Sequence, residues 1–184
     1  DERMTRSVVV QAPGAVEAAA VANALPARKA ELQEAIATTS RFAQLKDVHT
    51  QIAGNLLYIR FELSTGDASG HNMVTKAADA LMKWLLLEYP LLSYISISGN
   101  YCTDKKVSAV NGILGRGRYV VTEAVIGRDV CNKLLRTTPE KIAELNLKKN
   151  LIGTMLAGGL RSANAHFANM LLAFYLATGQ DAAN

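Results

Sequence analysis

The chain has 184 residues, of which 49% are hydrophobic and 20% are charged, a composition typical of a soluble globular protein. This composition excludes a disordered or fibrous protein, and the length fits one domain or one domain with part of a second. The formal net charge of +4 comes from the second half, because residues 101–184 carry eleven Lys and Arg against six Asp and Glu. A basic half favours an anionic ligand.

The sequence indicates a cytoplasmic protein without a metal centre. No window has the roughly 18 to 20 apolar residues that a membrane-spanning helix needs, and the start, DERMTRS, lacks the apolar core of a signal peptide. Cys102 and Cys131 form no CxxC pair, which fits a reducing compartment, and the three histidines have no zinc-ligand spacing.

The first 98 residues predict alternating strands and helices. Pro26 interrupts the first helix, Gly54-Asn55 forms a turn between the two middle strands, and Pro90 ends the second helix. The resulting order, β-α-β-β-α-β, is the ferredoxin-like signature. The predicted strands cover residues 7–11, 45–53, 56–63 and 92–98, and the predicted helices cover residues 15–38 and 70–88.

Two of these elements have a clear apolar face. Alternate residues of the third strand are apolar, and the second helix repeats apolar residues at spacings of three and four. We expect both faces to belong to the core. The residues are Leu57, Ile59, Phe61 and Leu63 in the strand, and Met73, Ala77, Leu81, Trp84 and Leu85 in the helix.

The second half predicts a mainly helical segment without a complete core. We expect a strand over 119–126 and helices over 127–135, 138–149 and 165–177. The last helix is rich in Ala, Leu and Met and needs a partner layer. The segment therefore fits part of a larger domain, completed by further chain or by another subunit, and the fold class is α+β.

Two polar segments could bind a ligand or take part in catalysis, and each can also be explained by a purely structural role. GDASGHN, residues 66–72, places glycines and helix N–H groups where they could hold phosphate, or it is a loop in which Asp67 caps the helix. SGNYCTDKK, residues 98–106, sets a lysine beside an acid, which could stabilise an oxyanion, or it is a charged surface loop.

Seven collinear segments resemble the class I branch of the 3-hydroxy-3-methylglutaryl-CoA (HMG-CoA) reductase family. The resemblance runs from end to end. The segments are MTRSVV at 4–9, SRFAQL at 40–45, HTQIAGNLLYIRF at 49–61, GDASGHNM at 66–73, SGNYCTDKK at 98–106, NLKKNLIGTMLAGG at 146–159 and NAHFANMLLAFYLATGQDAAN at 164–184.

The resemblance implies a small ferredoxin-like NADPH-binding domain inserted into a larger, mainly helical substrate-binding domain. Residues 1–6 would end a segment of the large domain, 7–98 would form the small domain, and 99–184 would form part of the large domain. The ligands would be NADPH and HMG-CoA. The family also implies a homo-oligomer, a dimer or a tetramer, whose active site spans the subunit interface, and no nucleic-acid partner.

The same resemblance assigns roles to individual residues. It implies that Lys105 and Asp181 are catalytic. The substrate-binding residues would be Arg6, Ser98, Asp104, Lys106, Lys149, His166 and Asn169. The cofactor-binding residues would be Ser40, Arg41 and Phe42 at the 2′-phosphate, together with Asp67, Ser69, Gly70, His71 and Asn72.

These roles make chemical sense. Thioester reduction needs a hydride donor and a cation over the carbonyl oxygen, where charge builds up in the transition state. Lys105 is the candidate cation, and Asp181 would keep it charged and oriented. The planar fork of Arg41 suits a phosphate and would favour NADPH over NADH.

The chain departs from the family pattern in two respects. The family loop is usually DAMGMN, whereas Ser69 and His71 stand here in place of the methionines. The family's catalytic glutamate precedes the MTRS segment and its catalytic histidine follows GQDAAN, so we expect that the 184 residues alone do not complete a turnover.

A non-catalytic ferredoxin-like binding module with a basic second half is the alternative. Such sheets bind RNA through exposed aromatic residues on the central strands. The pattern places Tyr58 and Phe61 on opposite faces and contains no RNP-like string, which disfavours this interpretation.

Overall fold

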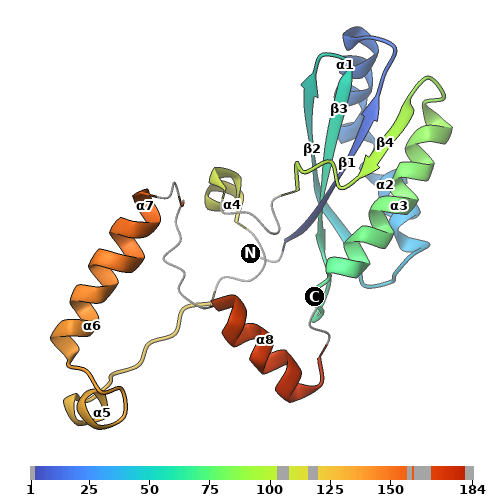
Figure 1. Cartoon of the computed structure of the whole chain (residues 1–184). Helices are drawn as coiled ribbons and strands as arrows, with labels where there is room; N and C mark the ends of the chain where they lie inside the picture. The colour runs from blue at the N-terminus through green and yellow to red at the C-terminus, as the bar shows by residue number, and fades with distance from the viewer. Residues whose placement is uncertain (1–2, 103–107, 116–119, 157–158, 160–166, 181–184) are drawn as a thin grey trace. The chain divides into compact units, whose positions relative to one another are not determined.

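A computed structural model describes residues 3–102, 108–115, 120–156, 159 and 167–180. The chain divides into two compact units, one built mainly from residues 1–106 and the other mainly from residues 119–183 (Figure 1).

The first unit is a mixed α+β structure around a four-stranded antiparallel sheet. The strand order is β2-β3-β1-β4. The predicted order of strands and helices is confirmed, including the helix break at Pro26, which lies in a 3₁₀ turn. The strands are β1 (Met4–Gln11), β2 (Gln44–Ala53), β3 (Leu56–Ser64) and β4 (Ser93–Ile97), and the helices are α1 (Ala15–Ala24), η1 (Leu25–Arg28), α2 (Lys29–Ala37) and α3 (His71–Glu88).

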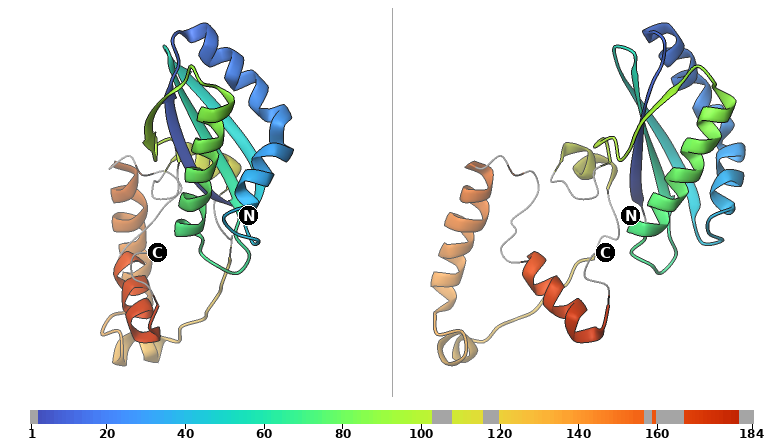
Figure 2. Two further views of the ribbon diagram at one scale, coloured as in Figure 1. Left: turned by 90° about the vertical axis from the view of Figure 1, so that its right-hand side faces the viewer. Right: turned by 45° about the vertical axis from the view of Figure 1, so that its right-hand side comes forward.

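The helices cover one face of the sheet, and the core lies between these two layers (Figure 2). The apolar faces predicted for β3 and α3 both belong to this core. The four alternate residues of β3 are at most 1% exposed, and Ala77, Leu81 and Leu85 of α3 are equally buried. Met73 and Trp84 are partly buried and pack against this core. The period of two in the strand and of 3.6 in the helix therefore located the core correctly.

β1 begins three residues earlier than the pattern predicts. Met4 and Thr5 pair with Leu63 and Glu62 of β3, and both are buried. The polar residues Thr5 and Arg6 interrupt the apolar run, so the local pattern ends the strand at Ser7. Pairing with β3 continues the strand to Met4, because the ladder bonds depend on the partner strand.

The other face of the sheet holds a buried group of charges. Arg60 and Glu62 of β3 are each 1% exposed, and their side chains form an ion pair of 3.0 Å. Arg60 pairs with Oε1 of Glu62, and His49 Nε2 lies 3.0 Å from the same oxygen. Arg3 Nη1 lies 2.5 Å from Glu62 Oε2. Buried charges persist only when they are paired, so this group ties β3 to its neighbours on either side.

The second unit is helical in its described part. α4 has no counterpart in the sequence prediction, and the helix predicted over 138–149 is instead α6 followed by a π-helix. The described helices are α4 (Ala109–Leu114), α5 (Arg128–Lys133), α6 (Pro139–Leu145), the π-helix η2 (Asn146–Gly153), α7 (Thr154–Leu156) and α8 (Phe167–Thr178).

The strand predicted over 119–126 is wrong for the described residues 120–126, which form no strand. Val120, Val121 and Val125 are 73%, 75% and 95% exposed. β-branched residues favour an extended backbone, but a strand also needs a neighbour to satisfy its N–H and C=O groups. The described part of the chain supplies none here.

Candidate functional site

The two loops assigned to the cofactor lie at the same end of the sheet. β2 begins at Gln44 and β3 ends at Ser64, and these two residues are paired in the antiparallel register. The Ser40–Phe42 segment enters β2 at this point, and the Asp67–Asn72 segment leaves β3 there (Figure 2). Strand pairing thus brings together two motifs that are distant in the sequence.

α3 begins with a glycine instead of a side-chain cap. Gly70 is the N-cap residue, with a φ of +92°, and as a glycine it supplies no side-chain cap hydrogen bond. The first turn contains no acidic residue, so the positive end of the helix dipole is not neutralised within it. Such a helix start suits a phosphate group. The interpretation of Asp67 as the cap is wrong, because the helix starts after Gly70 rather than after Asp67.

The loop before β2 presents an exposed guanidinium. Arg41 and Phe42 are both exposed, and Arg41 Cζ lies 4.7 Å from the centroid of the Phe42 ring. Ser40 Oγ accepts a hydrogen bond of 3.2 Å from the Phe42 N–H, which fixes the turn between them. A planar cation held in this way can bind a phosphate through two parallel hydrogen bonds.

Two residues assigned to the substrate also lie in the first unit. Arg6 is half-buried in β1 opposite Phe61, and its buried Nε has no hydrogen-bond partner among the described residues. Buried donors are rarely left without an acceptor, so an anionic ligand would complete this group. Ser98 follows β4 with a φ of +80°, and its N–H donates to the carbonyl of Ser7 at 2.8 Å.

The remaining predicted residues divide into two groups. Lys149, in η2, and Asn169, in α8, are exposed residues of the second unit. The others lie outside the described residues, and their predicted roles stay predictions. They are the catalytic Lys105 and Asp181 and the substrate-binding Asp104, Lys106 and His166.

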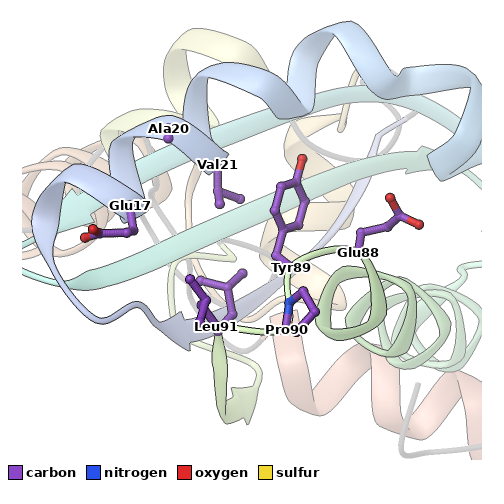
Figure 3. Close-up of a pocket in the computed structure, with 8 residues that line it drawn as sticks. Glu17, Ala20, Val21, Glu88, Tyr89, Pro90 and Leu91 are labelled. Atoms are coloured by element: carbon purple, nitrogen blue, oxygen red, sulfur yellow. The ribbon is translucent and has the colours of Figure 1, made fainter.

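A pocket of about 300 Å³ in the first unit lies between α1 and the end of α3. The side chains of Val21, in α1, and Leu91, after α3, point toward each other across it (Figure 3). The pocket lies at the end of α3, whereas the predicted cofactor loop lies at its start, and an 18-residue helix is about 27 Å long. The pocket is therefore separate from the predicted cofactor site. Its lining residues are Glu17, Ala20, Val21, Glu88, Tyr89, Pro90, Leu91 and Leu92.

Comparison with known proteins decides the family. The sequence profile of hydroxymethylglutaryl-coenzyme A reductase matches residues 1–184. The chain belongs to this family. It is 49% and 48% identical, over all 184 residues, to the 3-hydroxy-3-methylglutaryl-coenzyme A reductases of Pyrococcus abyssi and Pyrococcus horikoshii. It is 44% identical over 182 residues, or 98% of its length, to the reductase of the sea urchin Strongylocentrotus purpuratus.

The chain spans less than half the length of these reductases. The match covers 45% of the Pyrococcus abyssi protein, 44% of the Pyrococcus horikoshii protein and 20% of the sea urchin protein. No helix in the described part of the chain is long and apolar enough to cross a membrane.

The two departures from the usual family loop contact each other. Ser69 Oγ lies 3.0 Å from His71 Nδ1 at the start of α3. Both residues are polar and neither is buried, so this part of the loop presents hydrogen-bonding groups. The loop keeps Asp67, Gly70 and Asn72 around this pair.

Sequence reasoning missed three buried polar residues that organise the first unit. Arg60 and Glu62 lie in a strand whose alternation marks only its apolar face, and Ser7 lies in the apolar run SVVV. The segment after β4 contacts Ser7 and Arg60, and Glu62 is buried beside Arg60, so their burial depends on contacts that are distant in the sequence. The polar residues within otherwise apolar strands were the available signal.

The structure disfavours the RNA-binding alternative, because β3 lacks a pair of exposed aromatic side chains. Phe61 is 1% exposed and belongs to the core, and Tyr58 is only half-exposed on the opposite face. A base can stack only on an exposed ring, so β3 does not offer the pair of aromatic residues that such modules use.

Proposed function

We propose that the chain carries the cofactor-binding module and the lysine-bearing loop of an HMG-CoA reductase, which reduces HMG-CoA to mevalonate and CoA with NADPH. The family match over the whole chain is the observation that carries this proposal. The convergence of the two cofactor segments at one end of the sheet supports it.

The fold and the domain organisation form part of the proposal. The strand order β2-β3-β1-β4 with helices on one face supports a ferredoxin-like domain over residues 7–98. In the proposed protein this domain is inserted between residues 1–6, which end one segment of the large domain, and residues 99–184, which continue it. The exposed apolar side chains of α8 support a further covering layer, supplied by another part of the protein or by a second subunit in a homo-oligomer. We place this protein in the cytoplasm.

NADPH fits the residues at the end of the sheet. Arg41, with Ser40 and Phe42, would bind the 2′-phosphate, and the segment from Asp67 to Asn72 would bind the remaining phosphates at the start of α3. When bound, NADPH supplies the hydride. The hydrogen-bonded pair of Ser69 and His71 would contact the cofactor where the usual family loop has methionines.

The chain's own residues would bind the substrate and stabilise the transition state. Lys105 would place its ammonium over the thioester oxygen, where negative charge develops, and Asp181 would keep that ammonium charged. Arg6, whose Nε finds no acceptor in the described part of the chain, would bind the substrate carboxylate. The other proposed substrate-binding residues are Ser98, Asp104, Lys106, Lys149, His166 and Asn169.

Titration with NADPH and NADH tests the cofactor assignment. Arg41→Ala should weaken NADPH binding by about tenfold or more and leave NADH binding within twofold, because a hydrogen bond to a charged group contributes about 1.5–3 kcal/mol. Lys83→Ala removes an exposed charge at a distance from the loop and serves as the control. Equal losses for both dinucleotides would refute the 2′-phosphate role.

Mevalonate formation by the full-length protein tests the activity. The wild-type protein should consume two NADPH for each mevalonate, and Lys105→Ala should abolish this reduction while NADPH still binds. A full-length protein that binds NADPH but forms no mevalonate would overturn the proposed reaction.

A further inference from the structure

Ser7 binds four backbone N–H groups of the segment that follows β4. Its carbonyl accepts from the N–H groups of Ser98 at 2.8 Å and Gly99 at 3.1 Å. Its hydroxyl accepts from the N–H groups of Tyr101 at 3.1 Å and Cys102 at 2.9 Å. Ser7 is completely buried, so water does not compete for these bonds. One residue of β1 thus holds almost every backbone donor of residues 98–102.

Side-chain packing holds the same segment against the sheet. A Cβ on Gly99 would lie 3.0 Å from Val9 Cβ and 3.3 Å from the backbone of Val8, so the segment touches β1 directly. The Tyr101 ring lies over the buried guanidinium of Arg60, with 5.1 Å between its centroid and Arg60 Cζ. Cation–π contacts of this kind strengthen when the cation is desolvated.

The backbone of this segment is strained, which shows that its shape is imposed by these contacts. Ser98 and Asn100 have φ values of +80° and +58°, in a region that residues other than glycine seldom occupy. Such conformations persist where the surroundings over-determine them, and they occur often next to functional sites. Ser7 supplies four hydrogen bonds that hold this segment in shape.

The segment leads directly to residues 103–106, called the lysine loop because they include Lys105, which lie outside the described residues. Lys105 follows Cys102 by three residues, and three extended residues reach at most about 11 Å. The point at which the chain leaves Cys102 therefore limits where the Lys105 backbone can lie. A catalytic group must be held within about 0.5 Å of its productive position.

We propose that Ser7 is a positioning residue for the lysine loop, acting through the hydrogen bonds that hold residues 98–102 on β1. This inference rests on the proposed reductase function. Ser7 contacts neither substrate nor cofactor in this role, so its loss should change the turnover number more than the affinity for NADPH.

Thiol labelling measures the position of the segment without reference to activity. Cys102 is a buried thiol, 2% exposed, at the end of the segment, and Cys131 is an equally buried thiol in the other unit. The full-length protein is treated with iodoacetamide, and the labelling rate of each cysteine is followed by mass spectrometry of its peptide. Ser7→Ala should raise the rate at Cys102 by about tenfold, because two backbone N–H groups lose their acceptor, while Cys131 keeps its rate.

A second variant and two controls separate the segment from general instability. Gly99→Ala retains Ser7 but pushes the segment off β1, so it should also accelerate labelling of Cys102. Ser96→Ala makes the same chemical change in β4 at a hydroxyl that bonds only weakly to the next carbonyl. Ile59→Val lowers the stability of the core without touching the segment. Neither control should change the labelling of Cys102 by more than twofold.

Steady-state kinetics of the full-length protein complete the test. Ser7→Ala should lower kcat for mevalonate formation by about tenfold and leave KM for NADPH within twofold, as expected for misplacement of a catalytic group. An active wild-type protein whose Ser7→Ala variant keeps either its kcat or its Cys102 labelling rate would overturn the positioning role. A wild-type protein that makes no mevalonate would instead refute the proposed function, and the labelling result would still decide whether Ser7 holds the segment.

Discussion

Substitution of Gly70 by alanine probes the start of α3, where the structure makes a quantitative prediction. A Cβ at Gly70 would lie 2.4 Å from Thr65 Cγ2 and 2.7 Å from both Thr65 Cβ and Oγ1. Thr65 is buried, and its hydroxyl donates to the carbonyl of Ala68 at 2.8 Å, so it cannot move away freely. The φ of +92° adds a backbone penalty of about 1–2 kcal/mol, and the steric overlap adds about 1–3 kcal/mol.

We therefore expect Gly70→Ala to lower the free energy of unfolding by about 2–5 kcal/mol. Urea unfolding followed by the fluorescence of Trp84, which packs against the core of this unit, measures the change. Gly66→Ala is the matched control, because Gly66 has a φ of +64° and, apart from its chain neighbours, no atom of the described residues lies within 4 Å of its Cβ position. It should lose only the backbone contribution of about 1–2 kcal/mol. Equal losses in the two variants would show that Thr65 yields to the added methyl group and would refute the steric argument.

Two further predictions concern charged groups of the same unit. Glu62→Gln should lower the free energy of unfolding by about 3–5 kcal/mol, because it leaves the buried Arg60 without its counter-charge. As a control, Glu34→Gln at an exposed position should change the free energy of unfolding by less than about 0.5 kcal/mol. An equally small effect at Glu62 would show that the ion pair does not stabilise the fold. Lys29, 2.8 Å from Asp47, lowers the pKa of that carboxyl, so this pair stabilises the folded state above the ordinary pKa of aspartate and loses its effect as the pH falls below about 4. Both side chains are partly exposed, so the contribution stays below about 1 kcal/mol. Acid unfolding monitored by circular dichroism should show a smaller loss of stability between pH 5 and pH 3 for Lys29→Ala than for the wild type or for the control Lys46→Ala. The same loss of stability in all three proteins would contradict the role of the Lys29–Asp47 pair.

Local patterns predicted the first unit well, because its elements follow simple periods. Alternation in β3 and the three-to-four spacing in α3 each identified the face that is buried. The start of α3 was less accessible to prediction. Asp67 and Gly70 both suit the end of a loop, and only the backbone conformation shows that the helix begins after Gly70.

The errors share a physical cause, which is dependence on distant partners. Residues 120–126 have a high strand propensity but form no strand in the described structure, because a strand needs a paired neighbour. β1 extends to Met4 for the opposite reason, since β3 supplies pairing that the local pattern does not indicate. Neither outcome is encoded within a short window of sequence.

The amino-acid sequence by itself determined the family, the order of elements in the first unit and the apolar faces that form its core, because these depend on motifs and on short periods. Only the tertiary structure showed that the start of α3 and the loop before β2 meet at one end of the sheet, and that Arg60 and Glu62 are buried together. It also showed that Ser7 holds the backbone of Tyr101 and Cys102, 94 and 95 positions further along the chain. Contacts between residues so far apart in the sequence form only after the strands have paired, so no local sequence pattern predicts them.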